Sequence, residues 1–599
     1  MTASGQTAVF GVETSLTGQA WRMADADDRL VQACAQRHAL PDVVARVLVA
    51  RGVDLDDAAR FLNPTIRDLL PGLPPLRDLD IACDRLVRAI TGGQRIAVFG
   101  DYDVDGATST ALMLRFLRAV GADAAYYIPD RILEGYGPNE AAMRRLKEQG
   151  AAVVVTVDCG TTATAPLAAA RLMGLDVIVV DHHQADAVLP PCLALVNPNR
   201  QDEDADLRMR FGNLAAVGVA FLLVAGVNSA LDRAGWFGGG RRRPNPLDWL
   251  DLVALGTVCD VVKLKGLNRA FVTQGLKVMR TRGNPGLAAL ADVGGVTEPP
   301  GTYHAGFVLG PRVNAGGRVG RADMGTRLLS TDDPAEAGAI AAELDRFNEE
   351  RKAIEQAVQA EAVTCVGADC PDRIVVAAAE GWHPGVIGIV AGRLKDKYRR
   401  PTFVIAVDEG GIGKGSGRSV PGVDLGAAVR AAFEAGLLEN GGGHEMAAGL
   451  TVRAGNIAAL KAFFNDHLAG RAAATEEAHS LRIDAVLTVM GATPELIGVL
   501  EQAGPYGAGH REPRFVLPQA RLVKADVVGE NHVRCILSGR DGGRLKAIAF
   551  RAMEGPLGPG LLDAAAKGEP LHIAGHLRAD RWMGRLEAQL MIDDAASIF

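Results

Sequence analysis

Short apolar runs rich in valine and isoleucine recur along residues 76–330, and stretches of helical length separate them. The runs are residues 95–100, 152–157, 176–180 and 252–255. Apolar runs of four to six residues are typical of parallel strands that are buried on both faces. The intervening segments 108–120, 138–149 and 164–172 are expected to be helices. The pattern predicts an α/β domain built on a doubly wound parallel sheet.

The same criterion divides the rest of the chain into four further parts. They are an N-terminal extension at 1–75, one long bridging helix at 331–366, a second α/β domain at 367–475 and a β-domain at 480–599. The extension is expected to hold short helices at 42–51 and 56–61. The second α/β domain is expected to hold strands at 373–379 and 401–407 and a helix at 385–397. The β-domain holds five short alternating segments, at 520–528, 532–537, 544–550, 571–577 and 585–592. Five short strands predict a small barrel, with Phe515 and Phe550 expected in its core.

Carboxylates and imidazoles follow each apolar run of the first α/β domain. They are Asp101, Asp103 and Asp105 after the first run, Asp158 after the second, Asp181, His182 and His183 after the third, and Asp260 after the fourth. The ligand crevice of an open α/β sheet lies at the carboxyl ends of its strands, so these side chains are expected to meet. Carboxylate and imidazole ligands suit Mn²⁺ or Mg²⁺. The arrangement predicts a two-metal phosphoesterase site.

Each of these polar residues, taken alone, has a simpler explanation. An Asp at a strand end commonly caps a helix or forms a turn. However, Asp101, Asp103 and Asp105 would repel one another unless a cation or a basic cluster neutralised them. A calcium-binding EF-hand loop is a poor match, because a strand precedes the segment and Leu112 stands where the loop needs a glutamate. Polar groups after four successive apolar runs therefore favour metal binding.

The predicted site residues have different expected roles. The metal ligands are expected to be Asp103, Asp105, Asp158, His182 and Asp260. Asp158 follows the central strand and is expected to bridge the two ions. His183 is expected to stabilise charge on the phosphate or to protonate the leaving group. Asp101 either ligates a metal or acts from the second layer, and the sequence leaves both roles open.

Two glycine-rich segments of the second α/β domain, residues 411–419 and 441–444, suggest contacts with phosphate. Glycines let backbone N–H groups approach phosphate oxygens, although such segments are as often plain turns. The cationic or polar side chains of Arg418 and His444 within them favour substrate binding. The expected substrate-binding residues are Arg312, Asn314, Arg318, Arg393, Ser416, Arg418 and His444, with Arg351 and Lys414 as further cationic candidates.

Composition adds the expected class of protein and its compartment. The chain has 599 residues, of which 48% are hydrophobic, and eight cysteines without a CxxC pair, so neither a zinc cluster nor a disulfide framework is expected. No secretory signal or membrane-spanning stretch is evident, and a soluble cytoplasmic protein is expected. The net charge of −7 is compatible with nucleic-acid binding, because bound cations would offset the clustered aspartates. The three arginines at 241–243 are expected to lie in a solvated insertion.

Four motifs stand in a fixed order along the chain, at residues 101–106, 158–160, 181–183 and 256–260, with supporting segments at 197–199, 310–318, 344–351, 381–393 and 441–449. In this order they resemble the motifs of the DHH phosphoesterase superfamily and, within it, of the bacterial RecJ family. The resemblance covers most of the chain from about residue 50. DHH pyrophosphatases carry a histidine where this chain has Phe99, which disfavours that branch.

The resemblance implies a single-stranded-DNA-specific 5′→3′ exonuclease of recombination and repair that uses two Mn²⁺ or Mg²⁺ ions. It also implies a DHH-associated second domain, an OB-fold barrel, and single-stranded DNA, single-strand-binding protein and a RecQ-like helicase as partners. Two alternatives remain open: a phosphodiesterase of short oligonucleotides or cyclic dinucleotides, and a non-catalytic DNA-binding scaffold. The long helix and the barrel favour a long polymer, and retention of every motif ligand except at Phe99 disfavours the scaffold.

Overall fold

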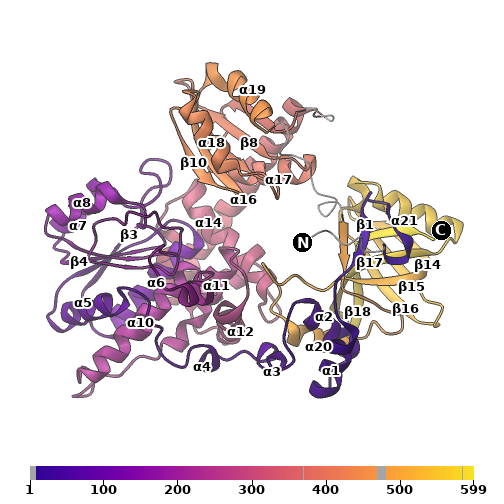
Figure 1. Ribbon diagram of the computed structural model, residues 1–599, viewed down its shortest axis with the longest axis horizontal. Coiled ribbons are helices and arrows are strands. Elements are labelled where there is room, and N and C mark those ends of the chain that lie inside the picture. Colours follow the sequence, from indigo (N-terminus) through magenta and orange to yellow (C-terminus); the bar gives the residue numbers. More distant parts are fainter. Residues whose placement is uncertain (1–7, 368–369, 371, 469–479, 583–584, 599) are drawn as a thin grey trace. The chain divides into compact units, whose positions relative to one another are not determined.

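The computed structural model describes residues 8–367, 370, 372–468, 480–582 and 585–598, and its ribbon is shown in Figure 1. The chain forms two compact units. One unit combines residues 1–65 with residues 474–599, and the other comprises residues 66–473. The second unit holds every residue that the sequence predicts for the metal site.

The second unit begins with the predicted parallel sheet, whose strand order is β3-β2-β4-β5-β6. The strands are β2 (Ile96–Phe99), β3 (Ala124–Tyr127), β4 (Val153–Val157), β5 (Asp176–Val180) and β6 (Ala194–Val196). Helices α5 (Leu79–Thr91), α6 (Val104–Ala119) and α10 (Ala216–Arg233) pack on the face of the sheet that holds Ile96 and Val98. Helices α7 (Glu140–Glu148) and α8 (Thr164–Leu172) cover the other face, against Ala97 and Phe99. Both faces are therefore buried, which confirms the doubly wound α/β fold.

The apolar run at 252–255 is not a strand, and this prediction was wrong. The run lies within α11 (Leu250–Cys259), a helix that is buried over most of its length between α6 and α12 (Gly266–Arg280). Gly275 of α12 lets the two helices approach closely, because a Cβ there would collide with Leu250 and Ala254. A short apolar run has the same composition in a buried helix and in a buried strand, so the pattern alone could not separate them.

A long helix, α16 (Pro334–Val366), follows as expected, and Asp333 caps its first turn by accepting from Ala335 N. It leads into a second sheet of order β10-β11-β9-β8-β7. The elements are β7 (Val375–Glu380), α17 (Ile387–Tyr398), β8 (Thr402–Val407), β9 (Ile412–Arg418), α18 (Leu425–Glu434), β10 (Asn440–His444), β11 (Ala447–Arg453) and α19 (Ile457–His467). Only β7 and β8 are parallel neighbours in this sheet.

The two glycine-rich segments are the strands β9 and β10 rather than loops, which corrects the expectation. Gly413, Gly415 and Gly417 alternate along β9 and face the hydrophobic core. A Cβ at any of them would come within 3.0 Å of a core side chain, such as Ile405 or Phe403. These glycines therefore serve packing of the sheet, and the polar side chains between them point to the other face.

The first unit contains the predicted barrel. Its strands are β14 (Phe515–Val528), β15 (His532–Ser538), β16 (Arg544–Ala549), β17 (Leu571–Trp582) and β18 (Arg585–Ser597), and pairing of β14 with β17 closes the ring. Phe515 lies in the core as expected, whereas Phe550 is 56% exposed and was misassigned. Phe550 directly follows the end of β16, where the chain leaves the sheet and its side chain faces solvent.

The N-terminal segment belongs to the same unit as the barrel. Strand β1 (Ala20–Met23) pairs in parallel with β12 (Ser480–Ile483), and the buried Trp21 donates from Nε1 to Asp594 at 2.9 Å. Helices α1 (Asp28–His38), α2 (Asp42–Ala50) and α3 (Ala58–Leu62) follow, and the last two match the expected short helices. Segments from opposite ends of the sequence thus share one hydrophobic core.

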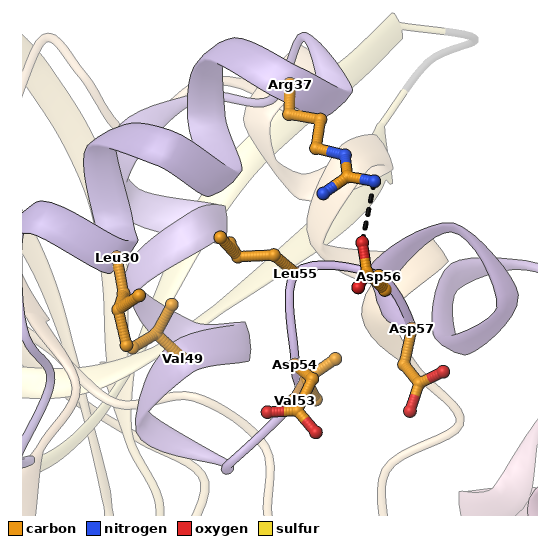
Figure 2. A pocket seen from close by; sticks show the side chains of 8 residues that line it. All are labelled: Leu30, Arg37, Val49, Val53, Asp54, Leu55, Asp56 and Asp57. Carbon is orange, nitrogen blue, oxygen red and sulfur yellow. Dashed lines mark ion pairs between the residues drawn. The ribbon is translucent and has the colours of Figure 1, made fainter.

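A surface pocket of about 430 Å³ lies among α1, α2 and the loop before α3. Figure 2 shows Leu30 and Val49 among the residues that line it, together with Asp54, Asp57 and the ion pair of Arg37 with Asp56 at 2.7 Å. Three carboxylates in the lining against one arginine would repel a phosphate backbone. This pocket is therefore a poor site for a nucleic acid strand.

The remaining described elements connect or cover these parts. They are α4 (Ile66–Leu69), α9 (Ala205–Phe211), α13 (Pro285–Val293), α14 (Gly310–Val319), α15 (Met324–Ser330), β13 (Ala485–Val486), α20 (Pro494–Ala503) and α21 (Leu557–Lys567). Within the described part of the chain, α10 alone is long and apolar enough to cross a membrane, and 72% of its apolar window is buried inside the unit. A core helix has these same properties.

Candidate metal centre

Three aspartates converge where β2 meets α6. Asp101 follows the strand, Asp103 caps α6 by accepting from Gly106 N at 3.0 Å, and Asp105 lies in the first turn of the helix. Any side chain at Gly106 would collide with the backbone of Asp101, so the tight turn requires glycine at this position. The turn folds three carboxylates towards one side, as the spacing of the motif predicts.

Asp158 follows β4, the central strand of the sheet, and only 2% of the residue is exposed. Its backbone has φ +61°, a left-handed conformation that aspartate tolerates better than most residues. The Tyr136 hydroxyl donates to the Asp158 carbonyl at 2.9 Å and holds this backbone in place. Tyr136 was not identified from the sequence, because no spacing rule links it to the motif 22 residues later.

His182 presents one ring nitrogen to the aspartates. Its Nδ1 donates to the Leu214 carbonyl at 3.0 Å, which leaves Nε2 as the free lone pair. That Nε2 atom lies 3.4 Å from Asp158 Oδ1, 3.6 Å from Asp260 Oδ2 and 4.0 Å from Asp105 Oδ2. Asp260 reaches this position from the end of α11, so a helix rather than a strand delivers the fourth motif.

Asp105 is fixed by the backbone of α10. Its carboxylate accepts from Ala216 N at 2.6 Å and from Val217 N at 2.9 Å. Three other acceptor atoms of the cluster are buried and have no hydrogen-bond partner among the described residues. They are Asp101 Oδ1, Asp260 Oδ2 and His182 Nε2. Buried acceptors without donors fit a site for a cation.

The potential ligand atoms fall into three groups, each within 4.8 Å of one another. The groups are Asp101 with Asp103 and Asp158, Asp105 with His182 and Asp260, and Asp158 with His182 and His183. Asp158 belongs to two groups, as a bridging ligand would. The structure thus brings together all seven residues that the sequence assigns to the metals and to catalysis, and it places Asp101 among potential ligands.

Electrostatics agree with a cation site. Burial, followed by repulsion from neighbouring carboxylates, raises the pKa of Asp105 and of Asp260 to about 7. The same causes raise the pKa values of Asp101 and Asp158 well above their usual range. The raised pKa values show that the ionised carboxylates are disfavoured where they are, and divalent ions would favour their ionised form. The oxygen-rich donor set with one imidazole fits Mn²⁺ or Mg²⁺.

Asp181 orients both histidines. Its Oδ1 accepts from His182 N at 2.8 Å and from His183 Nδ1 at 2.7 Å, and its Oδ2 accepts from Thr161 N at 3.0 Å. Burial opposes a charge on His183, but the bond to Asp181 outweighs it and raises the pKa of His183 to about 9. Burial alone would raise the pKa of Asp181, but the hydrogen bond from His183 holds the pKa of Asp181 below its usual range. The bond to Asp181 therefore favours the protonated form of His183.

The segment 197–199 braces the loop that carries the two histidines. Asn197 Nδ2 donates to the His183 carbonyl at 2.8 Å, and Asn199 Nδ2 donates to the His182 carbonyl at 2.6 Å. Phe99, by contrast, is fully buried in the core beneath α7 and α8 and stacks on Tyr127. It supplies no polar atom to the site.

Arginines gather on one side of the aspartates. Arg318 donates to the Gly385 carbonyl at 2.7 Å, and burial together with nearby Arg131, Arg351 and Arg418 lowers its pKa to about 9. Arg131 stacks over the Tyr102 ring at 4.8 Å. We call Arg131, Arg318 and Arg418 the arginine cluster. Because Arg131 and Arg418 both act to lower the pKa of Arg318, the three charges lie close together and form a site for an anion such as phosphate.

The predicted substrate-binding residues divide by their contacts. Arg418 donates to Ser416 Oγ at 3.3 Å. Ala447 pairs with both Arg418 and His444. Ser416, Arg418 and His444 therefore lie at the same end of the second sheet. Arg312 is instead bound to Asp345 at 2.8 Å.

Two further candidates, Arg393 and Asn314, lie apart from this end of the sheet. Arg393 pairs with the buried Glu355, which also binds Arg351 at 2.6 Å, so these two arginines are engaged in joining α16 to α17. Asn314 is half-buried on α14. Arg131 was missed from the sequence because it stands in a loop without a motif.

Known domain families and known proteins match most of the chain. Residues 95–257 match the DHH family N-terminal domain, residues 372–470 the DHHA1 domain and residues 483–594 the RecJ OB domain. The chain is 34% identical to the single-stranded-DNA-specific exonuclease RecJ of Bacillus subtilis, covering 96% of this chain and 70% of that protein. It is 36% identical to the Salmonella typhimurium protein of the same name, covering 85% and 89%.

Solved structures give the same result. The crystal structure of RecJ from Thermus thermophilus in complex with Mn²⁺ superposes with a TM-score of 0.78 at 31% identity, covering 96% of this chain and 79% of that one. The Mg²⁺ complex of the same protein gives a TM-score of 0.73 at 29% identity, covering 96% and 78%.

Proposed function

The chain belongs to the RecJ family, and from this premise we propose how it acts as a single-stranded-DNA-specific exonuclease. It is a metal-dependent hydrolase of phosphodiester bonds, with Mn²⁺ or Mg²⁺ as cofactor. The observation that carries its mechanism is the convergence of five buried or half-buried aspartates with His182. Three of the cluster's atoms, Asp101 Oδ1, Asp260 Oδ2 and His182 Nε2, are buried without a hydrogen-bond partner among the described residues.

We propose that two divalent ions occupy this cluster. Asp101 and Asp103 would hold one ion, and Asp105, His182 and Asp260 would hold the other, with Asp158 shared between them. When bound, the ions would stabilise the attacking hydroxide and the leaving oxygen of the phosphodiester. The side chains themselves contribute orientation: the backbone of α10 fixes Asp105, and the Leu214 carbonyl fixes the ring of His182.

His183 would act on the substrate directly. Its Nδ1 is bound to Asp181, so the proton on Nε2 is the one left for the phosphate. The side chain is 40% exposed, which leaves it accessible to a strand above the metal ligands. A positively charged imidazole there would neutralise charge on the phosphate in the transition state, or protonate the leaving oxygen.

The arginine cluster, with Ser416 and His444, would bind the backbone phosphate of the strand. Arg318 and Arg418 come from the two α/β domains of this unit, so a phosphate between them would be held by both. We propose that the enzyme releases nucleotides in the 5′→3′ direction, as the resemblance to the RecJ family implies.

The biological setting is also a proposal. A single-strand exonuclease with this composition would work in the cytoplasm, in recombination and repair of DNA. Single-stranded DNA is its substrate, and single-strand-binding protein and a RecQ-like helicase would supply and hold that strand. The acidic lining of the pocket in the first unit would not compete for it.

Digestion of end-labelled nucleic acids tests this function. Single-stranded DNA, blunt duplex DNA, RNA and a cyclic dinucleotide are incubated with the enzyme and Mn²⁺, with and without a chelator. We expect single-stranded DNA to be degraded far faster than the duplex, mononucleotides to be released first from the 5′ end, and the chelator to abolish both. Preference for the cyclic dinucleotide over a long strand would refute the proposal.

A further inference from the structure

The loop between β3 and α7 carries two side chains that reach the candidate site. Arg131 belongs to the arginine cluster, and its charge adds to the effect of burial in lowering the pKa of Arg418. Tyr136 donates to the Asp158 carbonyl at 2.9 Å, and its hydroxyl lies 3.2 Å from His183 Nδ1. One loop therefore contributes both to the anion site and to the backbone of a predicted metal ligand.

Hydrophobic packing does little to fix this loop. Leu133 is 85% exposed and Ile132 is 42% exposed. Gly135 and Gly137 have φ +83° and +82°, a left-handed region that glycine enters as readily as the right-handed one. A segment with few buried apolar contacts depends on hydrogen bonds for a defined conformation.

The side chain of Glu134 ties the loop together. Its Oε1 accepts from Asp130 N at 2.9 Å, and its Oε2 accepts from the Tyr127 hydroxyl at 2.8 Å and from Asn139 Nδ2 at 3.0 Å. Tyr127 is the last residue of β3, and Asn139 caps α7 by accepting from Ala142 N. One carboxylate thus links the middle of the loop to the strand before it and to the helix after it.

The turn that carries Arg131 is closed by the same two residues. The Asp130 carbonyl accepts from Glu134 N at 2.9 Å, and Asp130 Oδ1 accepts from Leu133 N at 2.9 Å. Arg131 lies inside this turn, and its guanidinium stacks over the Tyr102 ring at 4.8 Å. Glu134 therefore shapes the turn through both its backbone and its side chain.

We propose that Glu134 is a positioning residue for the exonuclease site, because its carboxylate holds the loop that places Arg131 in the arginine cluster and the Tyr136 hydroxyl on the Asp158 carbonyl. This inference rests on the proposed function and adds to it a residue that acts through two others. A carboxylate three residues from Arg131 would, by charge alone, oppose binding of a phosphate. Charge alone therefore predicts tighter binding when Glu134 is removed, whereas positioning predicts weaker binding.

The experiment combines strand binding with kinetics. Binding of a short 5′-phosphorylated oligothymidylate is measured over a range of salt concentrations with the metal chelated, so that no strand is cleaved. The values of kcat and KM are measured with Mn²⁺, and circular dichroism checks folding. The variants are Glu134→Ala, Glu134→Gln, Arg131→Ala and the double variant of Glu134→Ala with Arg131→Ala. Glu336→Ala is the matched control, because Glu336 also braces a loop, by accepting from Arg327 at 2.9 Å and from Thr331 at 2.6 Å.

We expect Arg131→Ala to weaken binding roughly 10-fold and to lower the salt slope by about one, as for loss of a charged phosphate contact. Glu134→Ala should change both quantities in the same direction, and it should also lower kcat because Tyr136 loses its fixed place. It should have little further effect on binding once Arg131 is absent. Glu134→Gln loses the charge but keeps one carbonyl acceptor, so its losses should be smaller than those of Glu134→Ala. Glu336→Ala should leave all of these values unchanged.

Tighter binding by both Glu134 variants would overturn the inference, because the carboxylate would then act through its charge alone. Wild-type affinity, salt slope and kcat in a less stable Glu134→Ala protein would also overturn it, since the role would then be structural only. The same holds if Glu134→Ala has its full effect on binding in the Arg131→Ala background. Failure of the wild type to degrade single-stranded DNA with Mn²⁺ would instead refute the proposed function, and the binding series needs no cleavage, so the two failures can be told apart.

Discussion

Replacing Asp158 with asparagine tests the two-metal arrangement most directly. Asparagine has nearly the same shape but no charge, and the site at Asp158 is buried, so the fold should be kept. Asp158 is shared by two of the three potential ligand groups, and its loss would weaken both metal positions at once. We expect hydrolysis of single-stranded DNA with Mn²⁺ to fall at least ~10³-fold, which corresponds to about 4 kcal/mol of transition-state stabilisation.

The same substitution should have a distinct effect on stability without metal. Burial, followed by repulsion from Asp103 and Asp105, raises the pKa of Asp158. The folded protein then binds this proton more tightly than the unfolded chain does. Stability without metal therefore falls as pH rises from the unfolded pKa towards the folded one. Asp158→Asn removes this penalty, so the metal-free variant should be at least as stable as metal-free wild type at neutral pH.

Thermal unfolding with and without Mn²⁺ completes the test. An ion at 100 times its Kd stabilises a folded protein by about 2.7 kcal/mol per site. We expect wild type to gain this increment and Asp158→Asn to gain much less. Asp123→Asn is the matched control, because Asp123 is an exposed aspartate paired with Arg95 at the amino edge of the sheet. Activity of Asp158→Asn within tenfold of wild type, in a folded protein, would refute the two-metal reasoning.

Three further expectations concern substrate binding, domain roles and pH. Arg418→Ala should weaken single-strand binding and lower the salt slope by about one, with Mn²⁺ affinity unchanged by calorimetry, whereas Arg453→Ala at the opposite end of the sheet should change neither. An isolated fragment of residues 66–473, checked for folding by circular dichroism, should lose far more activity on long strands than on trinucleotides; an unchanged ratio would remove the barrel from substrate binding. The Asp593 carboxylate raises the pKa of His576 despite burial, so this pair stabilises the barrel fully below pH ~6.5 and less as pH rises through the folded pKa. His576→Gln should flatten that dependence in urea unfolding followed between pH 6 and 9, and an unchanged slope would contradict it.

The sequence predicted the first sheet well because its strands are buried on both faces. Such strands are short apolar runs, and the polar residues that end them must meet at one edge, whatever the loops do. Residues 252–255 were misassigned because α11 is buried nearly all round, which erases the helical periodicity. The glycines of β9 were misinterpreted because the side chains that require them belong to neighbouring strands. The local sequence does not show those contacts.

Local motifs predicted which side chains form the candidate site but not what holds them. Asp181 and the asparagines at 197 and 199 act through hydrogen bonds to the histidine loop, and Tyr136 binds the backbone at Asp158. Such contacts depend on loop geometry that no periodicity encodes. Arg312 illustrates the converse, since its partner Asp345 stands 33 residues away and occupies a side chain that the sequence offers as free.

The pairing of β1 with β12 has a consequence for synthesis of the protein. The first residue of β12 lies 460 residues after its partner in β1. At about 5–20 residues per second, a ribosome needs roughly 25–90 s to make that interval. During this time Trp21 and the apolar residues around it have no partner strand, while the whole of the second unit can fold. The nascent chain therefore exposes an apolar segment near its N-terminus for most of translation. We expect this enzyme to need chaperones that bind apolar segments more than an enzyme whose barrel is contiguous in sequence.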